Sequence, residues 1–204
     1  MEYMKSQQKE KEMEYITTNG VKYGLAKEDC DEVKLADIPV GETCKIGEWE
    51  FIVCEHTREG TVLLMKDCLY DEKQFGNCNN YNESDVDTLC EEFSDKLAEV
   101  IGAENIILHT VDLTADDGLK DYGEIKRRVS LFTANQYRKY CDILDNYRLD
   151  KWTWTATAYS TPKHGEFYWV KCVAPRGDID YFSFNYDFFV RPSCILKSDI
   201  FVSK

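Results

Sequence analysis

The sequence predicts a single α+β domain that contains two helices and a mixed, mostly antiparallel sheet. Two stretches in the middle of the chain carry apolar side chains at the spacing of an amphipathic helix. Short strand-like runs, separated by turn residues, lie on both sides of these stretches. Because the strands gather towards the two ends instead of alternating with helices, an α+β arrangement is favoured over repeated βαβ units.

The N-terminal residues 1–20 are polar and charged and end in an Asn-Gly turn signal, so we expect a tail or a short helix there. Residues 21–204 are expected to form the single folded domain. Its core has ample material, since 43% of the whole sequence is hydrophobic. After an acidic connector, two strands are predicted at 49–54 and 61–65, joined by a short loop that contains glycine.

The first helix is predicted between Ser84 and Gly102. Ser84 is a good N-cap residue, and Asp87 three positions later resembles a capping box in which Asp replaces Glu. A second capping box, formed by Thr133 and Gln136, begins the other helix. The apolar face of that second helix is expected to carry Tyr137, Tyr140, Cys141 and Leu144. The outer face of the first helix is acidic and carries Asp85, Glu92, Asp95 and Glu99.

The remaining chain is predicted to form strands and loops. Strands are expected at 106–111 and 129–132, before and after a glycine-containing loop. Beyond the second helix, a run that alternates Trp and Thr begins the aromatic-rich last third. Its Trp152 and Trp154 are two positions apart, so both indoles point to one side of a strand, which we expect to be the core side.

The charge of the chain is strongly acidic. Its 38 acidic and 25 basic residues give a formal net charge of −13 over 204 residues. A surface of this kind repels phosphate backbones and anionic membranes, so we expect neither direct nucleic-acid binding nor membrane binding. The longest apolar runs are far shorter than the ~20 residues of a membrane span. A protein partner is the best expectation, including a basic nucleic-acid-binding protein, although acidity also simply keeps many proteins in solution.

The nine cysteines are odd in number, and no two lie closer than ten residues. This spacing excludes CxxC metal knuckles and redox pairs. The first residues have no apolar signal-peptide core, so we expect free thiols and a location in the cytoplasm of a bacterial host cell. The cysteines are Cys30, Cys44, Cys54, Cys68, Cys78, Cys90, Cys141, Cys172 and Cys194.

No sequence motif indicates catalysis, a metal or a cofactor. The three histidines, His56, His109 and His164, have no partner at the spacing that a metal site or a catalytic triad requires. Nucleotide-binding glycine loops and the GxSxG nucleophile motif are absent from the sequence. The Asp pairs at 116–117 and at 178 and 180 lack the ligand register of a calcium loop. We therefore expect a protein without cofactor or metal that is not an enzyme.

The aromatic residues of the last third are the candidate binding groups. Between 181 and 189 aromatic and polar residues alternate imperfectly, so one set of rings faces the core and the other faces solvent, where it would form a binding patch. Core packing is the alternative for most of them. An arginine beside a proline at a strand entry either binds an anion or acts as a structural anchor. The candidates are Tyr159, His164, Tyr181, Tyr186 and Arg191.

The order of six segments resembles a family of domains of unknown function that is abundant in Gram-positive gut bacteria and their phages, and whose C-terminal half resembles the C-type-lectin-like fold. The resemblance covers roughly residues 40–200. The segments are GEWEFIV at 47–53, FGNCNNYNESDV at 75–86, HTVDLTADDG at 109–118, YGEIKRRVSLFTANQYRKY at 122–140, WTWTATAYST at 152–161 and VRPSCIL at 190–196.

The resemblance implies a C-type-lectin-like domain whose long loops present a binding face, and it supplies no agreed catalytic residues. The leading hypothesis is a non-enzymatic recognition protein that uses residues 152–190. An alternative is an acidic phage-encoded inhibitor of the anti-CRISPR type, whose helix carboxylates mimic nucleic acid towards a host defence complex. A second alternative is an enzyme on the related fold of the copper-using enzymes that convert cysteine to formylglycine, but no two cysteines here match that spacing.

Overall fold

A computed structural model shows two compact units, Met1–Asp31 and Glu32–Lys204. In the first unit, strands β1 (Glu14–Thr18) and β2 (Val21–Leu25) pair as an antiparallel hairpin. A strand therefore occupies part of the segment 1–20 that was expected to be a tail or a helix, and the larger unit begins at Glu32 instead of residue 21. The residues that the structure describes are 14–18, 21–25, 32–69, 72–165 and 167–204.

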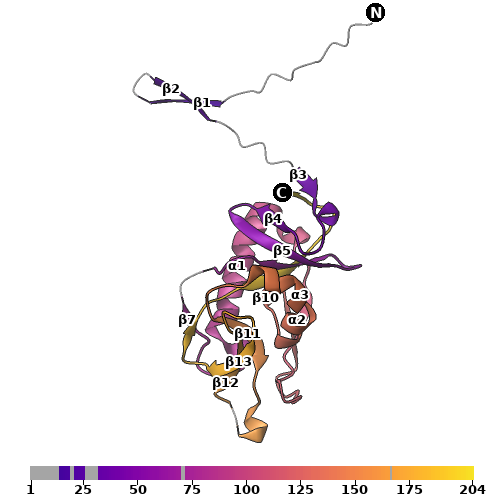
Figure 1. The fold of residues 1–204 in the computed structure, drawn as a ribbon, viewed down its shortest axis with the longest axis vertical. Helices are drawn as coiled ribbons and strands as arrows, with labels where there is room; N and C mark the ends of the chain where they lie inside the picture. The colour runs from indigo at the N-terminus through magenta and orange to yellow at the C-terminus, as the bar shows by residue number, and fades with distance from the viewer. Residues whose placement is uncertain (1–13, 19–20, 26–31, 70–71, 166) are drawn as a thin grey trace, which may run out of the picture. The chain divides into compact units, whose positions relative to one another are not determined.

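The larger unit is built on a seven-stranded antiparallel sheet, which confirms the expected α+β class (Figure 1). The strands predicted at 49–54 and 61–65 are present as β5 and β6. Across the sheet the order is β10 (Val129–Leu131), β15 (Pro192–Leu196), β6 (Thr61–Met65), β5 (Trp49–His56), β4 (Thr43–Ile46), β16 (Phe201–Ser203) and β3 (Glu32–Lys34).

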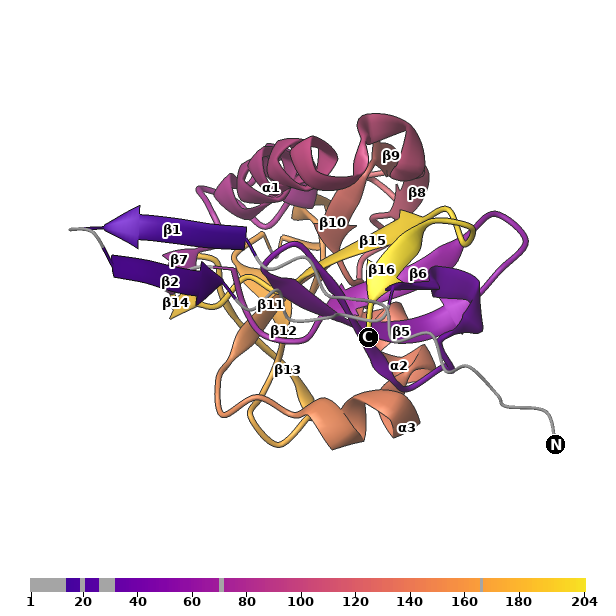
Figure 2. The same cartoon turned by 90° about the horizontal axis from the view of Figure 1, so that it is seen from above.

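Three helices cover the two faces of this sheet. Figure 2 shows α1 (Asp85–Ile101) on one side of β5, β6 and β15, with α2 (Ala134–Lys139) and α3 (Cys141–Leu144) on the other side. The alternation of side chains along β5 explains this arrangement. Phe51 and Val53 belong to the buried cluster that includes the α1 side chains, whereas Ile52 and Cys54 belong to the cluster that includes those of α2 and α3.

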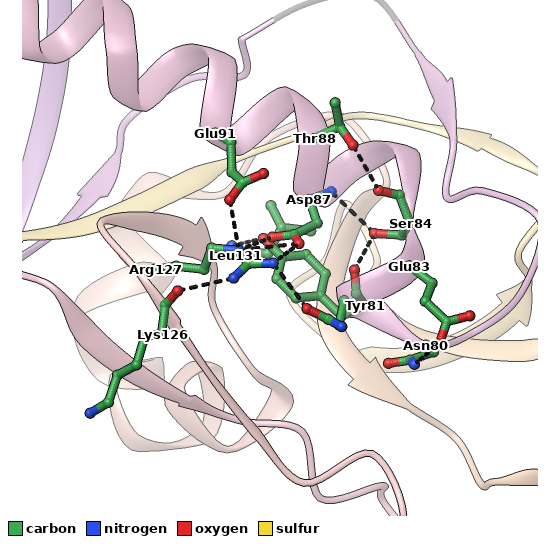
Figure 3. A network of polar contacts seen from close by, with 11 residues as sticks. Asn80, Tyr81, Glu83, Ser84, Asp87, Thr88, Glu91, Lys126, Arg127 and Leu131 are labelled. Carbon is green, nitrogen blue, oxygen red and sulfur yellow. Dashed lines mark hydrogen bonds and ion pairs between the residues drawn. The ribbon is translucent and has the colours of Figure 1, made fainter.

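The ends of α1 lie where the capping residues predict them. The Ser84 hydroxyl accepts a hydrogen bond from the backbone N–H of Asp87 at 3.1 Å, and Gly102 ends the helix with a positive φ of 84°. The Asp87 side chain, however, does not complete a capping box. It pairs with Arg127, whose Nη2 lies 2.6 Å from Asp87 Oδ2, while the guanidinium also contacts Asn82 (Figure 3). This pair connects the first turn of α1 to β9 (Glu124–Arg127).

The second predicted helix is divided in two. Thr133 and Gln136 form the expected capping box, but the helix stops at Tyr140, and α3 continues as a separate short helix. Tyr137, Tyr140 and Leu144 are buried as expected. Cys141 is exposed, so its expected place on the apolar face is wrong, because the break at Tyr140 turns the following residue outward.

A second sheet of three antiparallel strands contains β11 (Thr153–Ala158), β12 (Trp169–Val173) and β13 (Ile179–Ser183). The indoles of Trp152 and Trp154 share one side, as predicted, because both lie against Phe188, at ring distances of 5.5 and 4.6 Å. Trp154 is fully buried, and its Nε1 donates to the carbonyl of Lys73.

The smaller elements complete the unit. The strand predicted at 106–111 begins later, as β8 (His109–Asp112), and Ile106 before it forms an isolated bridge with Leu196. No helix in the described part of the chain is long and apolar enough to cross a membrane. The remaining strands pair as β7 (Lys73–Gln74) with β14 (Asp187–Phe188) and β8 (His109–Asp112) with β9. The 3-10 helices are Leu35–Asp37, Tyr81–Glu83, Ala103–Asn105, Asp145–Tyr147 and Pro162–His164.

Candidate binding face on the three-stranded sheet

The three-stranded sheet has one face in the main core. Along β12, Val170 and Cys172 are fully buried in that cluster, and Lys171 between them points the other way. On that other side, Val173 and Ile179 pack against the smaller cluster of α2 and α3. The register of β12 with β13 pairs Lys171 with Tyr181. We call the side that carries these two residues the outer face.

On the outer face a cation lies beside a pair of aromatic rings. The Lys171 side chain is only 8% exposed, and its Nζ lies 5.9 Å from the ring centre of Tyr159 and 5.4 Å from that of Tyr181. The two rings are 4.6 Å apart, and Trp169 meets Tyr181 edge-on at 5.8 Å. An ammonium group within about 6 Å of a ring centre is attracted to the face of the ring. Tyr181 itself remains 43% exposed.

A carboxylate neutralises the buried ammonium. Asp116 Oδ2 lies 3.4 Å from Lys171 Nζ, and Asp116 Oδ1 accepts a hydrogen bond from Arg138 Nη2 at 2.7 Å. Burial alone would raise the pKa of Asp116, but the Arg138 guanidinium and the Lys171 ammonium together lower it. The carboxylate therefore stays ionised, and Lys171 is held in place beneath the tyrosine rings.

At the edge of the outer face, the Asp117 carboxylate binds the side chains of both Ser160 and His164. The Ser160 hydroxyl and His164 Nδ1 both bond to the same oxygen, Asp117 Oδ2, at 2.6 and 3.0 Å. In a nucleophilic triad the imidazole lies between the serine and the carboxylate. Here the carboxylate lies between them, so His164 is not placed to take a proton from Ser160. The cluster fixes the loop after β11.

The structure brings three of the five candidate binding residues together. Tyr159, His164 and Tyr181 lie on or beside the outer face. Tyr186 is 51% exposed but contacts Phe182 and Phe188, which lie on the other side of the sheet.

Arg191 is only 4% exposed. Its Nε donates to the carbonyl of Met65, and its Nη2 donates to those of Lys66 and Tyr147. These bonds give Arg191 the anchoring role, one of its two predicted roles, and it is not part of the outer face.

Lys171 and Trp169 were not among the predicted binding residues. The sequence feature that could have indicated Lys171 is its place inside the apolar strand WVKCV, because a buried lysine needs a partner for its charge. Asp116 was considered only as a calcium ligand. Its true partners lie 22 and 55 positions further along the chain, at Arg138 and Lys171, and no local spacing reveals them.

The acidic helix face is open to solvent. All four of its predicted residues, Asp85, Glu92, Asp95 and Glu99, are exposed. Two other carboxylates of α1 are engaged instead: Asp87 and Glu91 both pair with Arg127, at 2.6 and 3.3 Å.

The other two histidines have structural partners. His56 bonds through Nδ1 to the Thr61 hydroxyl and through Nε2 to the carbonyl of Ile38, both at 2.9 Å. His109 Nε2 bonds to the Ser130 hydroxyl at 3.1 Å, and burial lowers its pKa. Among the described residues, no three His, Cys, Asp or Glu side chains gather as a metal site would need.

No protein-family model, curated protein or solved structure matches this chain.

Proposed function

We propose that this protein is a non-enzymatic recognition protein that binds a protein partner through the outer face. The observation that carries the proposal is the buried Lys171 ammonium beneath the rings of Tyr159 and Tyr181. Tyrosine and tryptophan dominate the energetic centres of protein interfaces, because they bury a large apolar area and keep a polar end. The Lys171–Asp116 pair holds these rings in one arrangement before the partner arrives, which lowers the entropic cost of binding.

Binding is favoured over catalysis because the polar groups of the outer face are already occupied. Ser160 and His164 share one carboxylate oxygen, and Lys171 is paired with Asp116. A catalytic base or nucleophile needs a free position towards its substrate.

We propose further that the domain has a C-type-lectin-like fold and acts in a bacterial cytoplasm. Helices on both faces of an antiparallel sheet, and a second small sheet carried by long connections, support the fold. In that fold the second sheet and its loops would form the binding region, which agrees with the position of the outer face.

A second candidate function is the acidic inhibitor of a basic nucleic-acid-binding protein. The observation that favours it is the row of four exposed carboxylates on α1. Such a face would act mainly by electrostatic steering, so association would be fast at low salt and would slow as salt is added.

Photo-crosslinking separates the two candidates. A benzophenone side chain replaces Tyr181 in one variant and Asp95 in another, and both are expressed in a Gram-positive host. We expect a defined crosslinked partner from position 181. A partner captured only from position 95 would contradict the proposal and support the inhibitor.

Surface plasmon resonance with the captured partner provides the second test. We expect Tyr159→Ala with Tyr181→Ala to weaken binding at least tenfold, because two ring contacts are lost. Tyr186→Ala is the matched control, since this exposed tyrosine lies off the outer face. Neutralising Asp85, Glu92, Asp95 and Glu99 to Asn or Gln should leave affinity unchanged. The opposite pattern would refute recognition through the outer face.

A further inference from the structure

A cavity of about 230 Å³ lies between α2–α3 and the end of the three-stranded sheet, away from the tyrosine rings of the outer face. Much of its wall is apolar and comes from Leu144 and Leu149 on one side and Val173, Pro175 and Ile179 on the other. A cavity of about 150 Å³ lined by apolar side chains holds a benzene molecule. The space here therefore suits one ring with a short substituent.

The charged residues of the cavity are mostly basic. Asp145 is the one carboxylate in the lining. The basic side chains are Arg138, Arg148, Lys151 and Arg191. Three of these cations are already paired with carboxylates: Arg148 with Asp145, Arg138 with Asp116 and Lys151 with Asp67. Arg191 forms no ion pair with the described residues, so it is the cation that remains for an anionic ligand.

The wall of the cavity holds a buried hydroxyl. Tyr137 is only 6% exposed, and its hydroxyl makes no hydrogen bond of normal distance and angle with the described residues, although Thr153 and Arg191 lie close enough to interact weakly with its oxygen. Burial raises its pKa, and the nearby Arg191 guanidinium partly offsets this effect. All three residues line the cavity. A buried hydroxyl without a well-placed partner costs free energy, which a ligand oxygen would recover.

Arg191 has donor capacity left at the same place. Its Nε and Nη2 donate to backbone carbonyls, whereas Nη1 makes no hydrogen bond of normal distance and angle with the part of the chain that the structure describes, and the guanidinium lies near the Tyr137 hydroxyl. A carboxylate that accepts from Arg191 Nη1 and from the Tyr137 hydroxyl would be held by charge-assisted hydrogen bonds.

We propose that this cavity binds a small carboxylate with an apolar body the size of a single ring. The carboxylate lies at Tyr137 and Arg191, and the ring lies against Leu144, Val173 and Ile179. Neither Tyr159 nor Tyr181 lines this cavity, although Arg138, which bonds to Asp116 beneath those rings, does. The variants that test the two proposals leave Arg138 and Asp116 unchanged, so either proposal can fail without the other.

Ligand-observed NMR titration of the full chain tests the chemistry of the site. Three probes are used: phenylacetate, its neutral isostere phenylacetamide, and inorganic phosphate. We expect phenylacetate to bind at least tenfold more tightly than either of the others, because only phenylacetate has both the charge and the ring. Absence of phenylacetate binding at millimolar concentration, or equal binding of the amide or of phosphate, would overturn the proposal.

Tyr137→Phe locates the site. This change removes the buried hydroxyl and leaves the packing, so we expect the melting temperature to stay the same or rise. Phenylacetate binding should weaken about tenfold, as for loss of one hydrogen bond to a charged group. Tyr140→Phe is the matched control on the same helical segment, because its hydroxyl donates to Glu55 and lies outside the cavity. Equal loss in both variants, or no loss in Tyr137→Phe, would show that phenylacetate does not bind there.

Discussion

Trp154 concentrates several contacts in one side chain. It is fully buried, contacts Phe75 and Phe188, and donates a hydrogen bond to the Lys73 carbonyl. We predict that Trp154→Ala lowers the free energy of unfolding by ~3–5 kcal/mol, the usual cost of truncating a large aromatic residue in a core. Urea denaturation measures the change. The control is Trp169→Ala on the outer face, which should cost clearly less, and an equal cost would contradict this description of the core.

The cysteines should differ sharply in reactivity in the folded state. Cys141 is exposed, whereas burial raises the pKa of Cys44, Cys54 and Cys172 to about 12. Since the thiolate is the reactive form, alkylation at pH 8 should modify Cys141 first and leave the buried thiols intact until the protein unfolds.

Mass spectrometry of alkylated peptides provides the measurement for this prediction. All nine cysteines, including Cys30, which lies outside the described residues, should be modified after denaturation without a reducing agent. Stable disulfides under thiol-trapping conditions, or rapid modification of Cys44 in the folded protein, would count against it.

Arg127 links α1 to β9 through ion pairs with Asp87 and Glu91, of which the Asp87 pair is the shorter and the more buried. The Asp87 side chain is 4% exposed, and Arg127 is its partner at 2.6 Å. Removing one member of a buried pair leaves an unpaired charge, so we predict that Arg127→Ala lowers the free energy of unfolding by ~3–5 kcal/mol. The exposed Arg176–Asp178 pair is the control, and Arg176→Ala should cost at most ~1 kcal/mol.

A double-mutant cycle distinguishes the pair from simple loss of side-chain packing. Combining Arg127→Ala with Asp87→Asn should restore part of the stability, since the unpaired charge is then absent. If the effects of the two changes simply add, the ion pair does not hold α1 in place.

Elements with local signals were predicted well from the sequence. Both ends of α1 follow from Ser84 and Gly102, and the start of α2 follows from Thr133 with Gln136, because capping uses residues a few positions apart. The break at Tyr140 was not predicted. The hydrophobic spacing continues through it, and only the packing in three dimensions separates α2 from α3.

The candidate site depended on contacts that local spacing does not encode. Tyr181 was predicted as a binding residue because aromatic and polar residues alternate between 181 and 189, which indicates that some of the rings are exposed. Its partnership with Lys171 comes from the register of β12 and β13, and Asp116 approaches from a distant loop. Arg191 was recognised as a possible anchor, and the carbonyls that it anchors belong to segments over 40 positions away.

The whole molecule should lose stability in acid. The pKa of Glu55 is lowered by hydrogen bonds from Lys139 and Tyr140, and that of Asp116 is lowered as described above. A carboxyl group whose pKa is lowered in the folded state contributes its full stabilisation at pH values above its unfolded pKa, which is about 4. That contribution is lost as the pH falls through the folded value, because the unfolded chain then binds more protons.

Urea denaturation between pH 7 and pH 2 tests this behaviour. We predict a free energy of unfolding that falls below about pH 4, and a shallower fall in Asp116→Asn, in which one of the titrating groups is absent. Asp199→Asn is the control, because this carboxylate forms no ion pair with the described residues. A fall of equal steepness in Asp116→Asn and the unmodified protein would contradict the role of Asp116.

The positions of β15 and β16 have a consequence for how the chain folds. β15 lies between β10 and β6, and β16 lies between β4 and β3, although both strands come last in the described sequence. Before they join, β4, β5 and β6 form only a local meander, and β3 and β10 have no neighbour in the sheet. Closing such long loops carries an entropic cost before any contact repays it. We therefore expect slow folding, on the order of milliseconds to seconds, in which the sheet is completed from both sides in its last step.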